Sequence, residues 1–406
     1  MIKVGVNIGN SKISCIVTEI KDDGNIKVLS AESYPSNILK KNIITNFEKL
    51  SNEIKNLILE SEKKSQTKIN SINLNIPTID SISKYYESEI SILDQAITEL
   101  DIKKAINNSD YFHIDKDYFE IFNNITGYVL DSNLIFDTPI GNYASKLKVL
   151  FYKIILPYKN LKRLKNVFDS LNINIECFVP SPLSSALSVL SEDEKKIGTI
   201  CIDLGHSNTS VSIFENNQFI YGDSFLVGSN SITNDLARGV STTLESAERL
   251  KTLYSSLISS PSDEFEIIEI PIISGENDKF YQINKLKINS IVKPRVEETL
   301  EIVWQKLKQN NLHKKQIKNV VLTGGGSQLE GISQYAELIF SSNVRIGSPS
   351  EKLISEKKFQ NPSFADVMGC SLFDKRNFSC NIIEKQGKKE KKASFSGFFD
   401  WLDQYI

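Results

Sequence analysis

Two short glycine-bearing turns, one near the start of each half of the chain, constrain the fold more than any other feature. The first lies in residues 4–12 and the second in residues 200–209. In each, an apolar strand leads into a polar turn and another apolar strand follows at once. Such a turn presents backbone N–H groups to an anion, because glycine allows close approach and Ser, Thr or Lys add donors. One such turn is first of all a hairpin. Two at matching places indicate a duplicated α/β fold that holds a phosphate-bearing ligand between its lobes.

A third glycine tract ends the apolar strand of residues 320–323 and precedes a helical pattern over residues 334–340. Ligands of open α/β sheets bind at the carboxyl ends of the strands. We therefore expect the three turns to surround one ligand. The residues expected to contact it are Gly9, Asn10, Ser11 and Lys12 in the first turn, Asp203, Gly205, His206, Ser207, Asn208 and Thr209 in the second, and Gly324, Gly325, Gly326 and Ser327 in the third.

The composition is that of a globular protein with two domains of ordinary size. The chain has 406 residues, of which 40% are hydrophobic and 24% charged, and a net charge of −2. This charge predicts no general affinity for nucleic acid. No apolar run reaches about 18 residues, so we expect no membrane-spanning segment, and the start of the chain lacks the pattern of a signal peptide. The cysteines have no CxxC spacing, so we expect no zinc site.

Periodicity divides the chain into two lobes with insertions. Helices are expected over residues 94–107, 158–170 and 290–309, among others. From about residue 83 to residue 157 the pattern becomes β-rich, which indicates a small inserted subdomain. The expected divisions are lobe I over residues 1–82 and 158–190, the insertion over 83–157, lobe II over 191–373 with a smaller, mostly helical subdomain at about 227–310, a flexible basic linker over 374–394 and a terminal helix over 395–406.

The last twelve residues have the pattern of an amphipathic helix. Five lysines between residues 385 and 392 precede them and would favour anionic headgroups by about 1 kcal/mol each near a membrane surface. The polar face carries acidic residues, where membrane-binding helices usually carry Lys or Arg, so docking on protein is the alternative. The residues expected to bind an anionic membrane surface are Phe395, Phe398, Phe399, Trp401, Leu402, Tyr405 and Ile406.

These segments resemble the FtsA family of bacterial cell-division proteins, which is part of the actin-like ATPase superfamily. The resemblance covers essentially the whole chain, and its most specific part is residues 227–239 with residues 247–254. It implies an α/β, actin-like two-lobed fold of duplicated ribonuclease-H-like lobes, with an inserted small α+β subdomain in lobe I and a C-terminal amphipathic helix. It also implies that Glu248 and Lys251 contact the ribose and adenine of a nucleotide. Alone, this pair would be a solvated ion pair one helical turn apart.

The resemblance implies ATP or ADP as the ligand, together with Mg²⁺. In the superfamily an aspartate that helps to hold the metal stands at the position of Asn7, whose amide lacks the negative charge that attracts Mg²⁺. Asp203 keeps its carboxylate, and we expect it to hold Mg²⁺ through water. On this basis an Asn7→Asp change should tighten Mg²⁺-dependent nucleotide binding.

The sequence also departs from the superfamily where hydrolysis is concerned. The glycine-rich run after the second aspartate is replaced by residues 206–208, and residues 180–184 hold no side chain comparable to the water-positioning glutamine of actin. We therefore expect at most a weak ATPase. Asp203 is the one candidate for positioning metal or water.

The resemblance implies that the protein polymerises, tethers the tubulin-like division protein FtsZ to the cytoplasmic membrane, and recruits later divisome proteins. Its partners would then be FtsZ, other divisome proteins, its own copies and an anionic membrane surface, but no nucleic acid. Its place would be the cytoplasmic face of the inner membrane at the septum, as a peripheral protein. Two alternatives share the fold. A small-molecule kinase would need an acidic base facing a substrate pocket and would not need the tail, and a pilus-assembly adaptor would pair with a different membrane complex.

Overall fold

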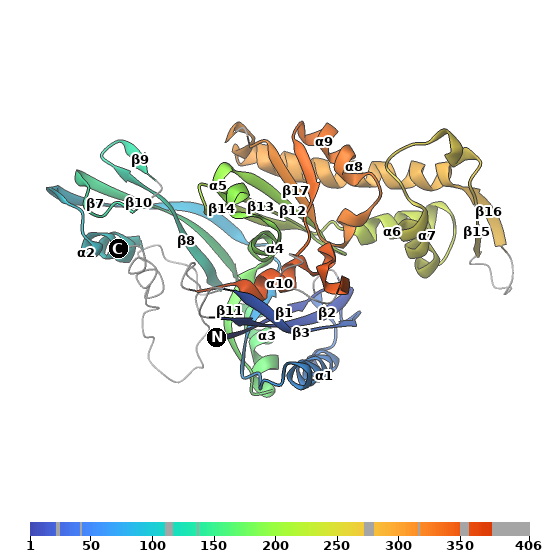
Figure 1. The fold of residues 1–406 in the computed structure, drawn as a ribbon, viewed down its shortest axis with the longest axis horizontal. Coiled ribbons are helices and arrows are strands. Elements are labelled where there is room, and N and C mark those ends of the chain that lie inside the picture. The colour runs from blue at the N-terminus through green and yellow to red at the C-terminus, as the bar shows by residue number, and fades with distance from the viewer. Residues whose placement is uncertain are drawn as a thin grey trace.

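The computed structural model describes residues 1–21, 25–40, 43–109, 117–135, 138–271, 280–315, 317–349 and 357–375. They form two lobes, each with an extension that projects to one side (Figure 1). Each lobe is built on one five-stranded sheet. The strands of lobe I are β1 (Ile2–Ile8), β2 (Lys12–Ile20), β3 (Ile26–Pro35), β6 (Ser71–Ile76) and β11 (Asn174–Pro180), and those of lobe II are β12 (Thr199–Leu204), β13 (Thr209–Glu215), β14 (Gln218–Phe225), β17 (Asn319–Thr323) and β18 (Asn343–Ile346).

The two sheets repeat one topology. Lobe I has the order β3-β2-β1-β6-β11 and lobe II the order β14-β13-β12-β17-β18. In each, the first three strands pair antiparallel and the last two pair parallel. Parallel neighbours need a crossover connection, and helices supply it: α1 (Phe47–Ser65) and α3 (Tyr158–Ser170) in lobe I, and α8 (Lys285–Gln309) and α9 (Ile332–Phe340) in lobe II. The duplicated fold expected from the paired turns is therefore present.

Helix α1 shows why these segments are helical. The side chain of Asn46 caps the helix by accepting a hydrogen bond from the backbone N–H of Lys49 at 2.9 Å. Its apolar residues Leu50, Ile54 and Leu57 recur at helical spacing and are fully buried against the sheet. α1 and α3 lie on the outer face of the lobe I sheet (Figure 1).

Two helices lie between the sheets, and each packs on the lobe to which it does not belong by sequence (Figure 1). α4 (Ser181–Val189) follows β11 of lobe I but packs on β12, β13 and β14 of lobe II. α10 (Ala365–Leu372) comes after lobe II but packs on β1, β2 and β6 of lobe I. The two helices touch at Gly369, where an added Cβ would lie 1.6 Å from the carbonyl oxygen of Ser184. Each lobe is therefore covered by a helix that follows the last strand of the other lobe.

The extension on lobe I has its own sheet, in the order β7-β10-β8-β9, and its own core. This segment is the one for which an inserted subdomain is expected. The core centres on Ile102, Leu147 and Phe151, which are fully buried. Its elements are β7 (Ile82–Ala96), α2 (Glu99–Ser109), β8 (Tyr118–Leu130), β9 (Asn133–Ile135) and β10 (Tyr143–Pro157).

The extension on lobe II is formed by two helices and a strand pair. These are α6 (Ser229–Gly239), α7 (Leu244–Tyr254), β15 (Ile267–Pro271) and β16 (Phe280–Asn284). The remaining regular elements are the strand pair β4 (Leu39–Lys40) and β5 (Ile43–Ile44), the short helix α5 (Glu192–Ile197), and 3-10 turns that include Gly325–Gln328 and Pro362–Phe364.

Two helix starts differ by five residues from the sequence-based expectation. The helix expected from residue 94 begins at Glu99, because β7 continues to Ala96 by pairing with β10. The helix expected from residue 290 begins at Lys285, where the side chain of Asn284 caps it. The linker beyond residue 375 and the terminal helix expected over residues 395–406 lie outside the described residues. Within the described ranges, no helix is long and apolar enough to cross a bilayer.

Candidate functional site

A cleft of about 750 Å³ lies where the three glycine-bearing turns meet, with walls from both lobes. Its volume is typical of a small-molecule site. Thr209 and Ser327 do not line it: Thr209 is buried in β13, and Ser327 is buried with its hydroxyl donating to the carbonyl of Gly324. The other expected residues do line it, namely Gly9, Asn10, Ser11, Lys12, Asp203, Gly205, His206, Ser207, Asn208, Glu248, Lys251, Gly324, Gly325 and Gly326.

The first two turns have the same geometry. The N–H of Gly9 donates to the carbonyl of Lys12, and the N–H of Gly205 donates to that of Asn208, both at 2.9 Å. An added Cβ would come within 2.9 Å of that carbonyl oxygen in the first turn and 2.8 Å in the second. Both positions therefore require glycine, and each turn leaves its polar tip facing the cleft.

The start of α6 holds the second turn in place, although the turn lacks the superfamily's further glycines. The N–H groups of Ser229 and Asn230 donate to the carbonyls of Gly205 and His206 at 2.9 and 2.8 Å. Burial is the main cause that lowers the pKa of His206, and the nearby Lys251 ammonium lowers it further. A neutral imidazole at pH 7 is consistent with a turn residue.

The third turn approaches Asp203 closely. Gly324 has a φ of +82°, and an added Cβ there would lie 2.2 Å from the carboxylate Oδ1 of Asp203. The backbone conformation and the contact both require glycine. Gly325, the next residue, has ordinary space around it, with Ser363 Cβ as its nearest neighbour at 3.6 Å.

This contrast predicts a difference between two neighbouring substitutions. Gly324→Ala should lower the free energy of unfolding by about 2 kcal/mol or more, because it adds left-handed strain and a clash with Asp203. Gly325→Ala, the matched control, should stay within about 0.5 kcal/mol of the wild type. Urea unfolding of the three proteins measures both values. Equal stability of the two variants would contradict the geometry described here.

Asp203 and Lys12 carry charge into the cleft, and the structure adds Asp366 from α10. Burial raises the pKa of both carboxyl groups, and the charge of Asp366 raises that of Asp203 further. Burial lowers the pKa of Lys12 to about 8, against the opposing effect of the two carboxylates. The Lys12 ammonium donates to Ser363 Oγ at 3.0 Å and lies 3.3 Å from the centre of the Phe364 ring.

Sequence reasoning missed part of the cleft floor. Asn7 Nδ2 donates to Asp366 Oδ2 at 2.7 Å, and Asn75 Nδ2 donates to Asn7 Oδ1 at 3.1 Å and to Ser181 Oγ at 3.0 Å. These residues come from β1, β6, α4 and α10, and Asn7 is 359 positions from Asp366. The one signal in the sequence was that Asp366 falls in the first turn of the last helix. That position does not indicate which strand the helix contacts, so it could not place Asp366 beside Asn7.

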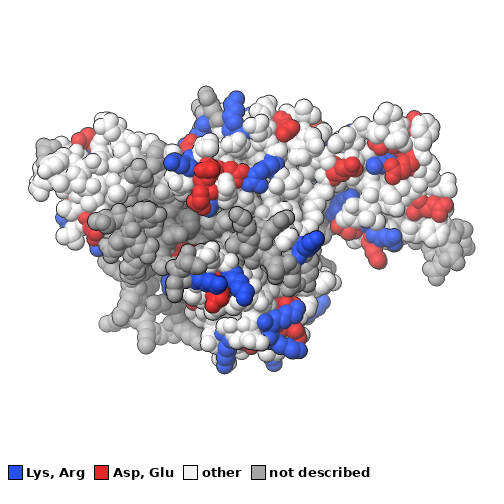
Figure 2. Space-filling view, viewed as in Figure 1, with Lys and Arg blue, Asp and Glu red and all other residues white. Residues whose placement is uncertain are grey.

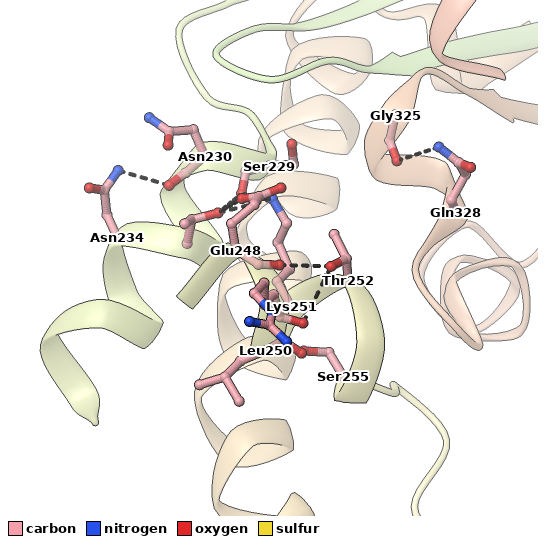
Figure 3. Close-up of polar contacts among 12 residues, drawn as sticks. Ser229, Asn230, Asn234, Glu248, Leu250, Lys251, Thr252, Ser255, Gly325 and Gln328 are labelled. Carbon is pink, nitrogen blue, oxygen red and sulfur yellow. Dashed lines mark hydrogen bonds and ion pairs between the residues drawn. The ribbon is translucent and has the colours of Figure 1, made fainter. Parts of the chain in front are cut away.

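Glu248 and Lys251 are held by α6 at the side of the cleft (Figure 3). The Lys251 ammonium donates to Glu248 Oε2 at 2.7 Å and to Thr233 Oγ1 at 2.9 Å, and Thr233 Oγ1 donates to the same carboxylate oxygen at 2.5 Å. Burial pushes the pKa of Glu248 up, but these hydrogen bonds outweigh it and the pKa is lowered. The Lys251 side chain is 9% exposed and the Glu248 side chain 43% exposed, so the lysine end of the pair is buried and the glutamate end is partly solvated.

The residues present fit a nucleotide with its metal. The glycine turns place backbone groups along the cleft at positions where a Cβ would clash with the turn itself or with Asp203, as close approach of backbone to a phosphate requires. Two carboxylates offer the oxygen chemistry that Mg²⁺ prefers. Among the described residues no group of three or more His, Cys, Asp or Glu could hold a metal ion. Phosphate oxygens would therefore have to complete the coordination of Mg²⁺ here.

The family model that matches this chain and two of its sequence relatives are described as cell division protein FtsA. The sequence model of the family described as "Cell division protein FtsA" matches residues 200–369. The chain is 28% identical to the cell division protein FtsA of Agrobacterium fabrum over 380 residues, covering 91% of this chain and 86% of that protein. It is 21% identical to that of Escherichia coli over 410 residues, covering 99% and 97%.

Solved structures confirm the actin-like fold. A PilM-PilN type IV pilus biogenesis complex matches with a TM-score of 0.62 at 14% identity, covering 91% of this chain and 97% of that chain. MreB5 of Spiroplasma citri bound to ADP matches with a TM-score of 0.55 at 14% identity, covering 92% and 96%. At this identity the likeness concerns the fold alone.

Proposed function

We propose that this chain, a relative of the cell division protein FtsA over most of its length, binds ATP or ADP in the cleft between its lobes and serves bacterial cell division as an actin-like protein. Nucleotide binding is supported above all by one observation: three glycine-bearing turns and the Glu248–Lys251 pair line the same cleft. The phosphates would lie against the turns, with Lys12 supplying positive charge, and the base and ribose would lie near α7.

The proposal extends to a tether between FtsZ and the membrane. The stripe of aromatic and aliphatic residues over 395–406 supports membrane binding by its pattern. One such helix binds a bilayer weakly, whereas several tails on one polymer bind with avidity. Polymerisation would therefore decide how long the protein stays at the cytoplasmic face of the membrane at the septum, where FtsZ and later divisome proteins would gather.

The charge on the face shown in Figure 2 is consistent with assigning membrane binding to the tail. On the face shown in Figure 2, basic and acidic side chains are interspersed over both lobes. That face does not present the described residues as one basic surface. The concentrated positive charge of the chain instead lies in the five lysines directly before the tail. The kinase and pilus-adaptor alternatives share the fold, but the sequence relatives reported above are cell-division proteins.

Nucleotide binding is tested by calorimetry with ATP and ADP. We expect both to bind, and we expect phosphate release near background, because residues 180–184 offer no water-positioning glutamine. Lys251→Met should weaken binding about tenfold, the size of one lost hydrogen bond to a charged group. Arg249→Ala removes the same charge from an exposed position on the same helix and is the matched control.

Two results would contradict this proposal in different ways. If neither nucleotide binds at millimolar concentration, the cleft is not a nucleotide site. If phosphate release is fast, nucleotide binding stands and the expectation of slow hydrolysis is wrong. An equal loss of affinity in Lys251→Met and Arg249→Ala would show that net charge, not the contact from α7, is responsible.

A further inference from the structure

We propose that Asp366, in the first turn of α10, supplies the metal-holding carboxylate that residue 7 lacks, and that it acts with Asp203 on the Mg²⁺ of a bound nucleotide through water. The inference rests on the proposed nucleotide binding. It differs from the sequence-based expectation, in which Asp203 alone serves the metal. The contacts of Asn7 carry the argument.

Asn7 stands at the end of β1 and orients Asp366. Its amide nitrogen donates to Asp366 Oδ2 at 2.7 Å, while its amide oxygen accepts from Asn75 Nδ2 at 3.1 Å. The second contact fixes the amide with its nitrogen toward α10. An aspartate at position 7 would instead place two carboxylates in direct contact, and like charges at this distance oppose ionisation of both. The amide at position 7 and the carboxylate at position 366 therefore suit each other, and a carboxylate at both positions would not.

Asp366 is well placed for this role. It lines the same cleft as Asp203, and the two carboxylates come from elements of opposite lobes, α10 on lobe I and β12 in lobe II. Its place in the first turn of a helix favours a negative charge. The backbone N–H of Val367 donates to its Oδ1 at 2.8 Å, which fixes one oxygen while Asn7 contacts the other.

The floor of the cleft beside this pair has an unused acceptor. Asn75 is 3% exposed and lines the cleft, and its Oδ1 is buried without a hydrogen-bond partner among the described residues. A buried acceptor without a partner costs free energy, so the hydrogen bonding of the cleft floor is incomplete within the part of the chain that the structure describes. Mg²⁺ keeps several waters and commonly binds one or two carboxylates together with phosphates. Asp203 and Asp366, which line the same cleft, match the carboxylates of that set.

The test compares how strongly Mg²⁺ enhances nucleotide affinity, measured by titration calorimetry with ADP in Mg²⁺ and in EDTA. Asp366→Asn should reduce the enhancement about tenfold or more, as loss of a partner outside the metal's direct ligands commonly does. The exchange variant Asn7→Asp with Asp366→Asn moves the carboxylate back to position 7 and should restore most of it. Asn7→Asp alone should melt below the wild type, because it places a second carboxylate against Asp366.

Each outcome decides the inference. If Asp366→Asn binds ADP with the full enhancement of the wild type, the inference is overturned and nucleotide binding stands. If the wild type binds no ADP in either condition, the inference and the proposed function fail together. Asp366→Asn removes one of two buried like charges but also one acceptor, for the Asn7 amide or for the N–H of Val367. Its melting temperature is therefore measured to confirm that the variant is folded during the titration.

Discussion

Replacing Phe398 and Trp401 together by glutamate should release the protein from anionic liposomes. An aromatic side chain that is fully buried contributes about 1.5–3 kcal/mol, so the loss of two corresponds to an affinity at least about a hundredfold lower. The two new negative charges would add repulsion from the headgroups. Sedimentation with liposomes that contain anionic lipid measures the bound fraction.

The matched control keeps the apolar stripe and changes only the polar face. Asp400→Asn with Asp403→Asn removes two negative charges from the same segment and should bind at least as well as the wild type. High salt should weaken the part of the binding that depends on the lysines of residues 385–392 and spare the apolar part. If the double glutamate variant still sediments with liposomes, the segment packs on protein and the membrane assignment is wrong.

Gly369→Ala should destabilise the protein severely, although alanine is the better helix former. Helix propensity alone predicts a gain of about 1 kcal/mol in the interior of α10. The added methyl group, however, would lie 1.6 Å from the backbone oxygen of Ser184 in α4. Backbone atoms cannot rotate away as the end of a side chain can, so the helices must separate. We expect a loss of about 3 kcal/mol or more in the free energy of unfolding.

Thermal unfolding and the yield of soluble protein measure this effect. Gly239→Ala is the control, since Gly239 is also helical but its added methyl group would meet only the flexible end of Ile291, at 2.7 Å from Cδ1. It should stay within about 1 kcal/mol of the wild type. A Gly369→Ala protein that melts at or above the wild-type temperature would show that α4 and α10 do not touch at Gly369.

The lobe architecture could be predicted because it depends on short-range signals that occur twice. The strand, glycine turn and strand of residues 4–12 recur at 200–209, and both form the same hydrogen-bonded turn between two inner strands of the same kind of sheet. Helix α3 has its expected bounds, Tyr158–Ser170, because its apolar spacing is complete within the helix. The predicted start of α2 was wrong because Gln95 and Ala96 pair with β10, a strand about 50 residues later in the chain.

The amino-acid sequence by itself determined which segments form strands, helices and glycine turns, and therefore which backbone groups face the cleft, because these depend on neighbours within a few residues. Only the tertiary structure decided what surrounds each side chain there. It brought Asp366 to Asn7 across 359 positions, joined Lys251 to Thr233 on another helix, and placed Gly369 against Ser184. Such contacts follow from how α10, α7 and α4 pack, and helix packing depends on the shapes of both surfaces at once, which a local pattern does not contain.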